Sequence, residues 1–422
     1  MGYTKRTLEN GMRILVVPMV GNPTVTVAVF VEAGSKYETK DTSGISHFLE
    51  HVCFKGTLSR PNASDLSTEL DGLGCDSNAF TGEEYTGYYA KVKASNFGKL
   101  LEIIADLYLN PIFKSDEIEK EKGVIIDEIN MYDDTPTEKV DEVWMSLLYG
   151  DQPAGWPITG EREVVRNMTR EDIVRYRAAH YVAEATTVVI SGNVDVATAL
   201  EMVAEKFKGI STGTKSSKEK ILITQEGPQV ATLYKKTNQT HFLLGVHSFD
   251  VHDDRDTTAT VLAGILGSGM SSRLFRRIRE DVGVGYYVRA INESLTDHGY
   301  FVLSAGIANE RFEEVVKVML SELRDLKENL VGEAELSKVK EHLVGTSYLN
   351  LERSDDLAFH YGMPEIHRCE IRTPEEEEGR IRAVTAEELR DLARTLFVEQ
   401  NLNLAYIGPS KNTSRLRSLL KL

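Results

Sequence analysis

The sequence predicts an α+β protein made of two homologous domains, and three observations support this. The chain has 422 residues, more than one ordinary hydrophobic core organises. Runs of β-branched residues alternate along it with amphipathic helical patterns. These patterns start again after residues 209–220, a stretch of Gly, Ser, Thr and Lys that is typical of a linker. We therefore expect domains at 1–210 and 225–422, joined by a linker at 211–224.

Local patterns define the elements of the first domain. Period-two alternation and β-branched runs predict strands at 7–17 (entered through an Asn-Gly turn), 24–31, around 78–81, 85–92 and 187–191. Apolar periodicity predicts helices at 43–54, 96–110 and about 115–132. A capping box at Thr169–Asp172 opens a further helix.

The second half repeats the first at an offset of about 215 residues. The apolar positions Phe97, Leu100, Leu101, Ile104, Ala105 and Tyr108 recur as Phe312, Val315, Val316, Met319, Leu320 and Leu323. Asp41-Thr42 recurs as Asp256-Thr257, and the capping box recurs at Thr385–Glu388. Agreement at one offset in three places predicts two homologous domains of about 200 residues each.

The stretch Ser43–Phe54 has two contrasting faces when it is drawn as a helix. An apolar stripe forms at i, i+3, i+4 and i+7, from Ile45, Phe48, Leu49 and Val52. His47, Glu50 and His51 fall on the opposite side. Side chains four apart stack on one side of a helix, so both imidazoles can reach one metal ion, with the carboxylate beside the fourth coordination position. The pattern H-x-x-E-H is the inverse of the commoner H-E-x-x-H metal helix.

The alternative is a core helix with two exposed histidines. The repeat argues against it, because His47, Glu50 and His51 become Leu262, Ile265 and Leu266 in the second domain. The second domain keeps the helix and loses its polar face. A metal site is therefore expected in the first domain alone.

A catalytic zinc needs a third protein ligand. Glu121 and Glu128 lie seven residues apart on one face of the 115–132 helix, and Val339 and Thr346 replace them in the second domain. One should be the ligand and the other its outer-shell neighbour. The alternative is a solvated acidic face, and spacing alone does not choose between Asp127 and Glu128.

Composition excludes several classes of partner. A net charge of −16 argues against nucleic acid and anionic membranes and is compatible with basic peptides. No apolar run approaches the length of a membrane span, and the first residues lack a basic and apolar leader. The three cysteines have no metal-type pair spacing. We expect a reducing compartment, the cytoplasm.

With Glu128 following the H-x-x-E-H pattern by about 77 residues, the sequence resembles the pitrilysin and mitochondrial processing peptidase family, the inverzincins. The resemblance implies two domains that each pack helices on an antiparallel-rich sheet, and one Zn²⁺ per chain. It assigns His47, His51 and Glu128 as zinc ligands, so it selects Glu128 as the acidic ligand. It further makes Glu50 the general base and Glu121 the outer-shell acid.

The resemblance extends over nearly the whole chain. Its further motifs are the Asn-Gly strand, Asn78–Thr81, Gly160 before the Thr169 helix, Ser191–Asp195, Ser271–Glu280 and Gly285–Val288. It places Asn78, Ala79 and Phe80 on an edge strand that takes an extended substrate by β-augmentation. It makes Arg279 and Tyr286 a pair that binds the substrate backbone and helps to hold the tetrahedral intermediate. Without the resemblance, Arg279 reads as a surface charge.

The expected function is zinc-dependent hydrolysis of short or unfolded peptides by an endopeptidase. The alternatives are a non-catalytic scaffold subunit of a peptidase-like complex, or a zinc enzyme for another small substrate. Single-chain relatives place zinc in the first of four domains and the Arg/Tyr pair in the fourth. This chain has two domains, so we expect a homodimer in which Arg279 and Tyr286 complete the zinc site of the other subunit. The alternative is completion within one chain.

Overall fold

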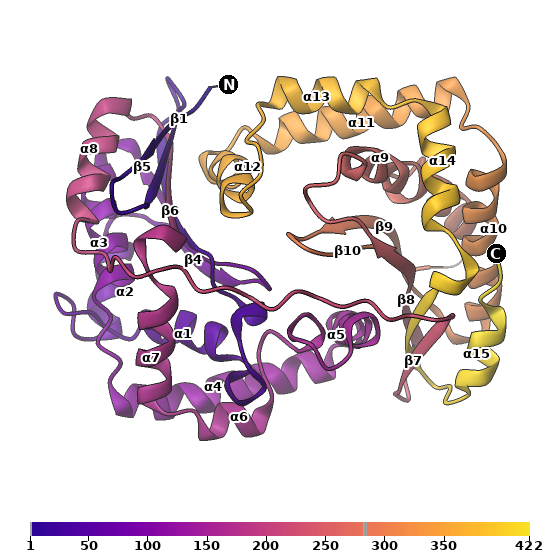
Figure 1. The fold of residues 1–422 in the computed structure, drawn as a ribbon, viewed down its shortest axis with the longest axis horizontal. Coiled ribbons are helices and arrows are strands. Elements are labelled where there is room, and N and C mark those ends of the chain that lie inside the picture. The colour runs from indigo at the N-terminus through magenta and orange to yellow at the C-terminus, as the bar shows by residue number, and fades with distance from the viewer. Residues whose placement is uncertain (1, 282, 284) are drawn as a thin grey trace. The chain divides into compact units, whose positions relative to one another are not determined.

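Two β-sheets, each packed with helices, organise the chain and confirm the α+β prediction (Figure 1). The computed structural model describes residues 2–281, 283 and 285–422. Unit 1 comprises Met1–Asn130, Trp156–Glu219 and Leu349–Thr373. Unit 2 comprises Met131–Gly155, Lys220–Tyr348 and Pro374–Leu422. Each unit thus takes one segment from a distant part of the chain.

The sheet of unit 1 has the strand order β1-β2-β6-β3-β5-β4, which leaves β4 at an edge. Its strands are β1 (Thr4–Thr7), β2 (Arg13–Pro18), β3 (Thr24–Val31), β4 (Asp76–Thr81), β5 (Thr86–Lys93) and β6 (Thr186–Gly192). All neighbours are antiparallel except β2 and β6. Residues 7–17 do not form one continuous strand. Gly11 adopts a positive φ of 87°, the chain turns there, and β1 and β2 pair as a hairpin.

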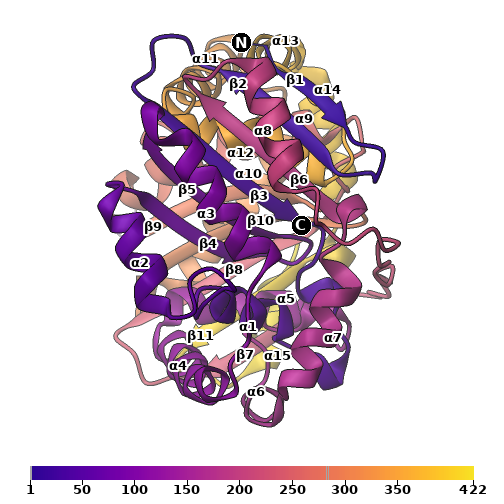
Figure 2. The same cartoon turned by 90° about the vertical axis from the view of Figure 1, so that its left-hand side faces the viewer.

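Both faces of this sheet are buried, as its central strand shows. On β3, Val25, Val27 and Val29 face the core beneath the helices α1 (Ile45–Cys53) and α3 (Phe97–Leu109). The intervening Ala28 and Phe30 face a second cluster on the other side of the sheet. Figure 2 shows α3 crossing β5 and β3 from the first side. A strand that is apolar on both sides needs a layer of helix on each.

The other helices of unit 1 are α2 (Ala63–Gly72), α4 (Ser115–Asp134), α6 (Arg162–Asn167), α7 (Arg170–His180), α8 (Val196–Lys206) and α12 (Ser354–Ile366). Of these, α4 and α7 were predicted from the sequence, whereas α2, α6, α8 and α12 were not. Thr169 caps α7 as expected, accepting the Asp172 N–H. The second face of the sheet is covered by α12, whose Leu357, Ala358 and Tyr361 pack on it.

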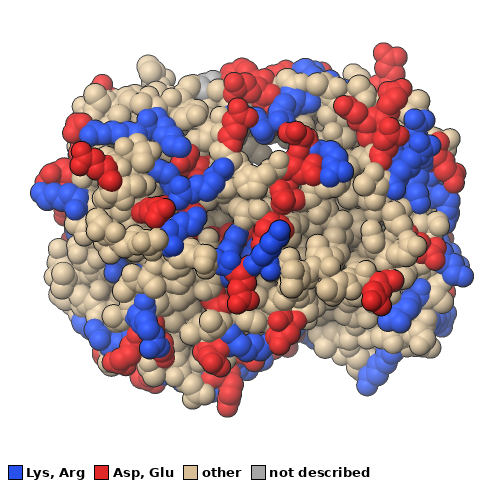
Figure 3. All heavy atoms as spheres, viewed as in Figure 1, with Lys and Arg blue, Asp and Glu red and all other residues tan. Residues whose placement is uncertain are grey.

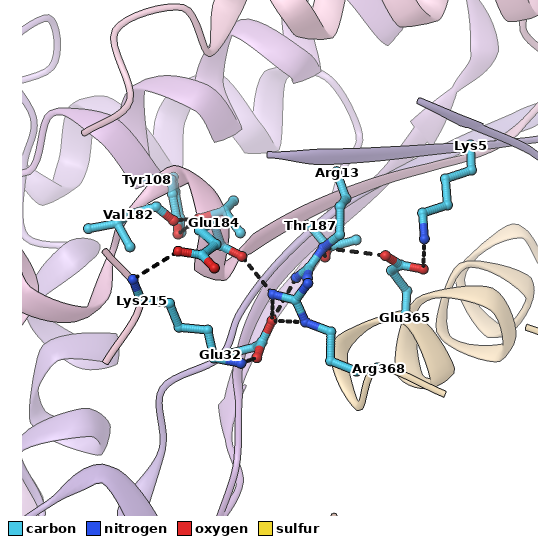
Figure 4. Close-up of polar contacts among 11 residues, drawn as sticks. Lys5, Arg13, Glu32, Tyr108, Val182, Glu184, Thr187, Lys215, Glu365 and Arg368 are labelled. Carbon is cyan, nitrogen blue, oxygen red and sulfur yellow. Dashed lines mark hydrogen bonds and ion pairs between the residues drawn. The ribbon is translucent and has the colours of Figure 1, made fainter. Parts of the chain in front are cut away.

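Ion pairs fasten the α12 segment to the strands beneath it (Figure 4). The buried Arg13 on β2 pairs with Glu32 at 2.8 Å and with Glu365 of α12 at 3.4 Å. Lys5 donates to the same Glu365 at 2.7 Å, and Arg368 pairs with Glu32 at 2.5 Å. Because Arg13, Glu32 and Glu365 are buried, losing one of them would leave another as an unpaired charge in the interior.

Unit 2 repeats the arrangement on a sheet of order β7-β11-β8-β10-β9. Its strands are β7 (Gln229–Tyr234), β8 (Gln239–Ser248), β9 (Tyr287–Ser294), β10 (Gly299–Ala308) and β11 (Asn403–Gly408). Its helices are α5 (Pro136–Tyr149), α9 (Asp256–Gly267), α10 (Phe312–Glu328), α11 (Glu333–Asn350), α13 (Pro374–Ala383), α14 (Ala386–Leu396) and α15 (Thr413–Leu419). Here α5 covers the second face of the sheet, through Trp144 and Leu148. Thr385 caps α14 just as Thr169 caps α7.

The stretch between α8 and β7, which includes the expected linker, forms no helix or strand. Its first part is nevertheless held on unit 1. Lys215 pairs with Glu32 (Figure 4), Ser216 donates to the carbonyl of Ala179, and Lys218 pairs with the buried Glu84. The linker is therefore anchored at several points before the chain enters unit 2.

On the face in Figure 3, acidic and basic side chains are interspersed rather than separated by sign. Within residues 2–281, 283 and 285–422, every helix is too short or too polar to cross a bilayer. Cys53, Cys75 and Cys369 are not joined in disulfides.

Gly362 tests the packing of α12 on the sheet. A Cβ at Gly362 would stand 2.6 Å from the Phe30 ring, whereas one at Gly123 on α4 would meet nothing within 4 Å. Gly362→Ala should therefore lower the free energy of unfolding by about 1–3 kcal/mol through overpacking. Gly123→Ala should raise it by up to about 1 kcal/mol through helix propensity. Denaturant unfolding of both variants measures this, and equal stabilities would contradict the close contact.

Candidate functional site

The N-terminal end of α1 is held by backbone packing and by a carboxylate. Gly44 and Gly160 adopt φ angles of 89° and 80°, and a Cβ on Gly44 would lie 2.7 Å from the Cα of Gly160. Gly44 offers no capping side chain. The buried Glu38 replaces it, accepting the N–H groups of Gly44 at 2.7 Å and Ser46 at 2.8 Å. The start of α1 is thus fixed against the core.

The two faces of α1 separate as the sequence predicted. The stripe of Ile45, Phe48, Leu49 and Val52 is buried in the core of unit 1. The other side carries the candidate metal residues and faces α4. His47 and His51 lie with ring centroids 4.6 Å apart. Glu128 of α4 reaches both, with its Oε2 at 3.6 Å from His47 Nε2 and 3.5 Å from His51 Nε2.

These three side chains fit a zinc ion. Each offers one ligand atom, and the three atoms lie within 4.8 Å of one another. Ligands around a tetrahedral zinc at about 2.0–2.1 Å stand roughly 3.4 Å apart, close to the two distances to Glu128. Asp127, the alternative that spacing left open, is exposed instead. Two imidazoles and one carboxylate form a donor set that leaves a fourth position open.

Glu121, the candidate outer-shell acid, contacts one of the candidate zinc ligands. Its Oε1 accepts from His51 Nδ1 at 2.9 Å, and Lys55 Nζ pairs with its Oε2 at 2.8 Å. The bond fixes the His51 ring so that Nε2 points toward Glu128. Lys55 was not predicted as a site residue, although its position four residues after His51 signals proximity to this cluster.

Burial and charge set the protonation of the cluster. Burial and the neighbouring His51 lower the pKa of His47 to about 3, so its ring stays neutral and keeps a lone pair. Burial alone would lower the pKa of His51, but the hydrogen bond to Glu121 and the charge of Glu50 outweigh it and raise that pKa. Burial raises the pKa of Glu50 against the opposing hydrogen bond from Thr81. A raised carboxyl pKa suits a group that exchanges a proton near neutral pH.

The candidate substrate strand and the candidate base lie together. Asn78, Ala79 and Phe80 lie on β4 at the edge of the sheet, where the Asn78 side chain accepts the Ala79 N–H at 2.9 Å. Thr81 ends the strand and donates to Glu50 Oε2 at 2.6 Å. Thr81 was missed as a site residue, although it stands in the Asn78–Thr81 motif.

Arg279 and Tyr286 lie together in unit 2. Arg279 is on a π-helical segment, Phe275–Asp281, with its guanidinium 5.2 Å from the Phe275 ring centroid. Tyr286 has a side chain that is 65% exposed, and its N–H donates to the carbonyl of Gly306. Together they line a cavity of about 330 Å³ with Gly283, Gly285 and Ala308.

In unit 2, α9 meets α11 through Gly264, on the other side of the helix from Leu262 and Leu266. Leu262, Ile265 and Leu266 on α9 are fully buried. Val339, which replaces Glu121, packs on α9 so tightly that a Cβ at Gly264 would stand 2.9 Å from its methyl group. The same pair of helices is therefore joined by apolar contact, whereas in unit 1 it is joined by the ionisable cluster.

Comparison with known proteins finds relatives over nearly the whole chain. Residues 13–162 match the family described as Insulinase (Peptidase family M16), and residues 167–343 match the Peptidase M16 inactive domain. The chain is 32% identical over 409 residues to the uncharacterized zinc protease YmxG of Bacillus subtilis, covering 96% of this chain and 98% of that protein. An uncharacterized zinc protease of Streptomyces coelicolor is 30% identical over 420 residues, covering 98% and 91%.

Solved structures share the fold. A protease from Helicobacter pylori superposes with a TM-score of 0.89 at 23% identity, covering 97% of this chain and 99% of that one. A chain of complex III2 from Candida albicans, with Inz-5 bound, gives a TM-score of 0.87 at 19% identity and covers both chains fully, at 100%. The chain thus belongs to peptidase family M16, the insulinase and pitrilysin family, as the resemblance in its sequence predicted.

Proposed function

We propose that this chain is a zinc-dependent endopeptidase that hydrolyses short or unfolded peptides. The observation that carries the proposal is the meeting of His47, His51 and Glu128 at zinc-ligand spacing, with Glu50 beside them on α1. The relatives are named as uncharacterized zinc proteases, which supports the choice of metal. We assign one Zn²⁺ to each chain.

A zinc ion held by these residues supplies Lewis acidity, which polarises a peptide carbonyl and acidifies a water molecule. Glu50 accepts one proton from the attacking water and later gives it to the departing amine, so its carboxylate is regenerated. Glu121 keeps the His51 ring in orientation throughout. Arg279 and Tyr286 provide positive charge and an O–H donor where the carbonyl oxygen becomes negative.

The substrate class follows from the edge strand. The backbone groups along the open side of β4 can pair with an extended peptide, which would displace the Asn78 side chain from the Ala79 N–H. A folded protein rarely offers such a free, extended backbone. The proposed substrates are therefore oligopeptides and unfolded segments.

The proposed assembly is a homodimer with two shared sites. Each site joins the zinc cluster of one subunit to Arg279 and Tyr286 of the other, as a twofold axis allows. The rival is a site completed within one chain. A scaffold role remains the main alternative to catalysis, and the occurrence of this fold in a chain of complex III2 motivates it.

The first prediction concerns the base. Glu50→Gln should retain zinc but lower kcat by about 10²- to 10⁴-fold, because only the proton acceptor is lost. His51→Ala should lose both zinc and activity, and chelation followed by added zinc should abolish and restore cleavage. Metal analysis and a peptide-cleavage assay on the same samples measure these effects.

The matched control is Glu119→Gln, an exposed acid on α4 that pairs with Lys122 away from the cluster. It should leave zinc content and kcat unchanged. Full activity in Glu50→Gln would contradict the mechanism. A wild-type chain that binds zinc and cleaves no peptide would favour the scaffold alternative.

A second prediction concerns the state of the substrate. A small disulfide-locked protein should resist cleavage in its native form and be cut after reduction and unfolding, because β-augmentation needs an exposed strand. Mass spectrometry of timed digests compares the two forms of the same sequence. Equally rapid cutting of the native form would contradict the role of Asn78, Ala79 and Phe80.

A third prediction separates shared sites from internal ones. Glu50→Gln and Tyr286→Phe chains are refolded together with different tags, so that heterodimers can be isolated. In the shared arrangement one of the two sites in each heterodimer is intact, and random mixing restores about a quarter of all sites. In the internal arrangement every site keeps one defect, and the mixture stays as inactive as its parents.

The reciprocal control mixes wild type with a chain that carries both substitutions. Shared sites leave only wild-type homodimers active, about a quarter of all sites, whereas internal sites leave about half. Heterodimers that form without recovery of activity in the first mixture would overturn the shared site.

A further inference from the structure

The general base is held by a side chain of the substrate strand itself. We propose that Thr81 is a positioning residue, whose hydroxyl orients the Glu50 carboxylate and couples that orientation to the pairing of a peptide along β4. The inference rests on the proposed function and deepens it.

The contact between the two residues is short and directional. Thr81 Oγ1 donates to Glu50 Oε2 at 2.6 Å. Hydrogen bonds to an ionised carboxylate are about twice as strong as neutral ones. Over residues 2–281, 283 and 285–422, no other group donates a hydrogen bond to this carboxylate. The half-buried Glu50 thus depends on Thr81 for its orientation.

The backbone of Thr81 faces the open edge of the sheet. The N–H of Gly82 bonds to the carbonyl of Tyr85, which closes the turn between β4 and β5. The next pair along the ladder is Thr81 and Thr86, and such pairs alternate between bonded and non-bonded. The N–H and C=O of Thr81 therefore point away from β5. The Ala79 N–H, two residues earlier, also avoids β5 and bonds to Asn78.

The side chain of Thr81 faces the opposite way from its neighbour. Phe80 packs against Phe30 and Phe359, in the cluster under α12. Because successive side chains alternate across a strand, Thr81 points to the other face, where α1 lies. One residue therefore presents its backbone to an incoming peptide and its hydroxyl to the base.

This arrangement predicts how substrate and base are coupled. A peptide that pairs with the free N–H and C=O of Thr81 restrains that residue, which restrains the hydroxyl and so the carboxylate. Thr81 keeps its own proton, while Glu50 carries the transferred proton between water and amine. The coupling acts on the rate of the chemical step more than on binding, because the backbone groups are unchanged by loss of the hydroxyl.

The test uses one substitution at two paired positions. Thr81→Val removes the hydroxyl and keeps the shape. Thr86→Val makes the same change across the ladder, where the Thr86 hydroxyl donates to the carbonyl of Ala33 at 2.9 Å and does not meet Glu50. Thr81→Val should lower kcat about 10- to 100-fold while KM and zinc affinity change less than about threefold. Thr81→Ser should restore kcat to within about threefold, and Thr86→Val should lower the melting temperature without lowering kcat.

Crystal structures of the zinc-loaded variants add a readout that needs no turnover. The Glu50 carboxylate should keep its place in Thr81→Ser and leave it in Thr81→Val. An unmoved carboxylate in Thr81→Val would overturn the proposal, whether or not the wild-type chain cleaves peptides. A wild-type chain that cleaves no peptide would separately refute the proposed function. A kcat for Thr81→Val within twofold of wild type, or a loss matched by Thr86→Val, also overturns it.

Discussion

The contact between α1 and α4 is the constraint on which the site depends. A helix of nine residues must bury an apolar stripe and hold two imidazoles toward Glu128 on its other side. Helical spacing places both imidazole rings on one side of α1, but the direction in which that side faces depends on how the helix is anchored. The Gly44–Gly160 contact and the Glu38 carboxylate anchor its first turn. The site is therefore a consequence of core packing on the hidden face of α1.

The two units show that this fold does not require the site. Both place a helix of the same kind on a sheet and pack a long helix against it. In unit 1 the two helices meet through His51 and Glu121, whereas in unit 2 Val339 packs directly over Gly264. Ionisable groups at a buried contact cost free energy unless each finds a partner. The apolar contact between α9 and α11 shows that the fold does not need ionisable groups between these two helices. A functional role therefore explains the ionisable contact between α1 and α4.

Local periodicity made the helices α1, α3, α4 and α7, the strands β2 to β6 and the two faces of α1 predictable. The pattern of apolar residues on α4 also decides between Asp127 and Glu128, which the spacing of the acids alone does not. Its buried residues Ile118, Glu121, Ile125 and Ile129 define one face, which places Asp127 outward. Spacing places Lys55 and Thr81 near the cluster, but it does not give their contacts with Glu121 and Glu50. Those contacts follow only when β4 and α4 are placed beside α1. The same holds for α12 and α5: β3 is apolar on both faces, but that pattern does not say which distant helix covers it.

The central claim is that His47, His51 and Glu128 hold a zinc ion and leave one position for water. X-ray absorption at the zinc edge of the purified chain tests it most directly. We expect two imidazole nitrogens, one carboxylate oxygen and one further oxygen at about 2.0–2.2 Å from the zinc. A shell containing sulfur, fewer than two imidazoles, or a spectrum unchanged in His47→Ala would contradict it.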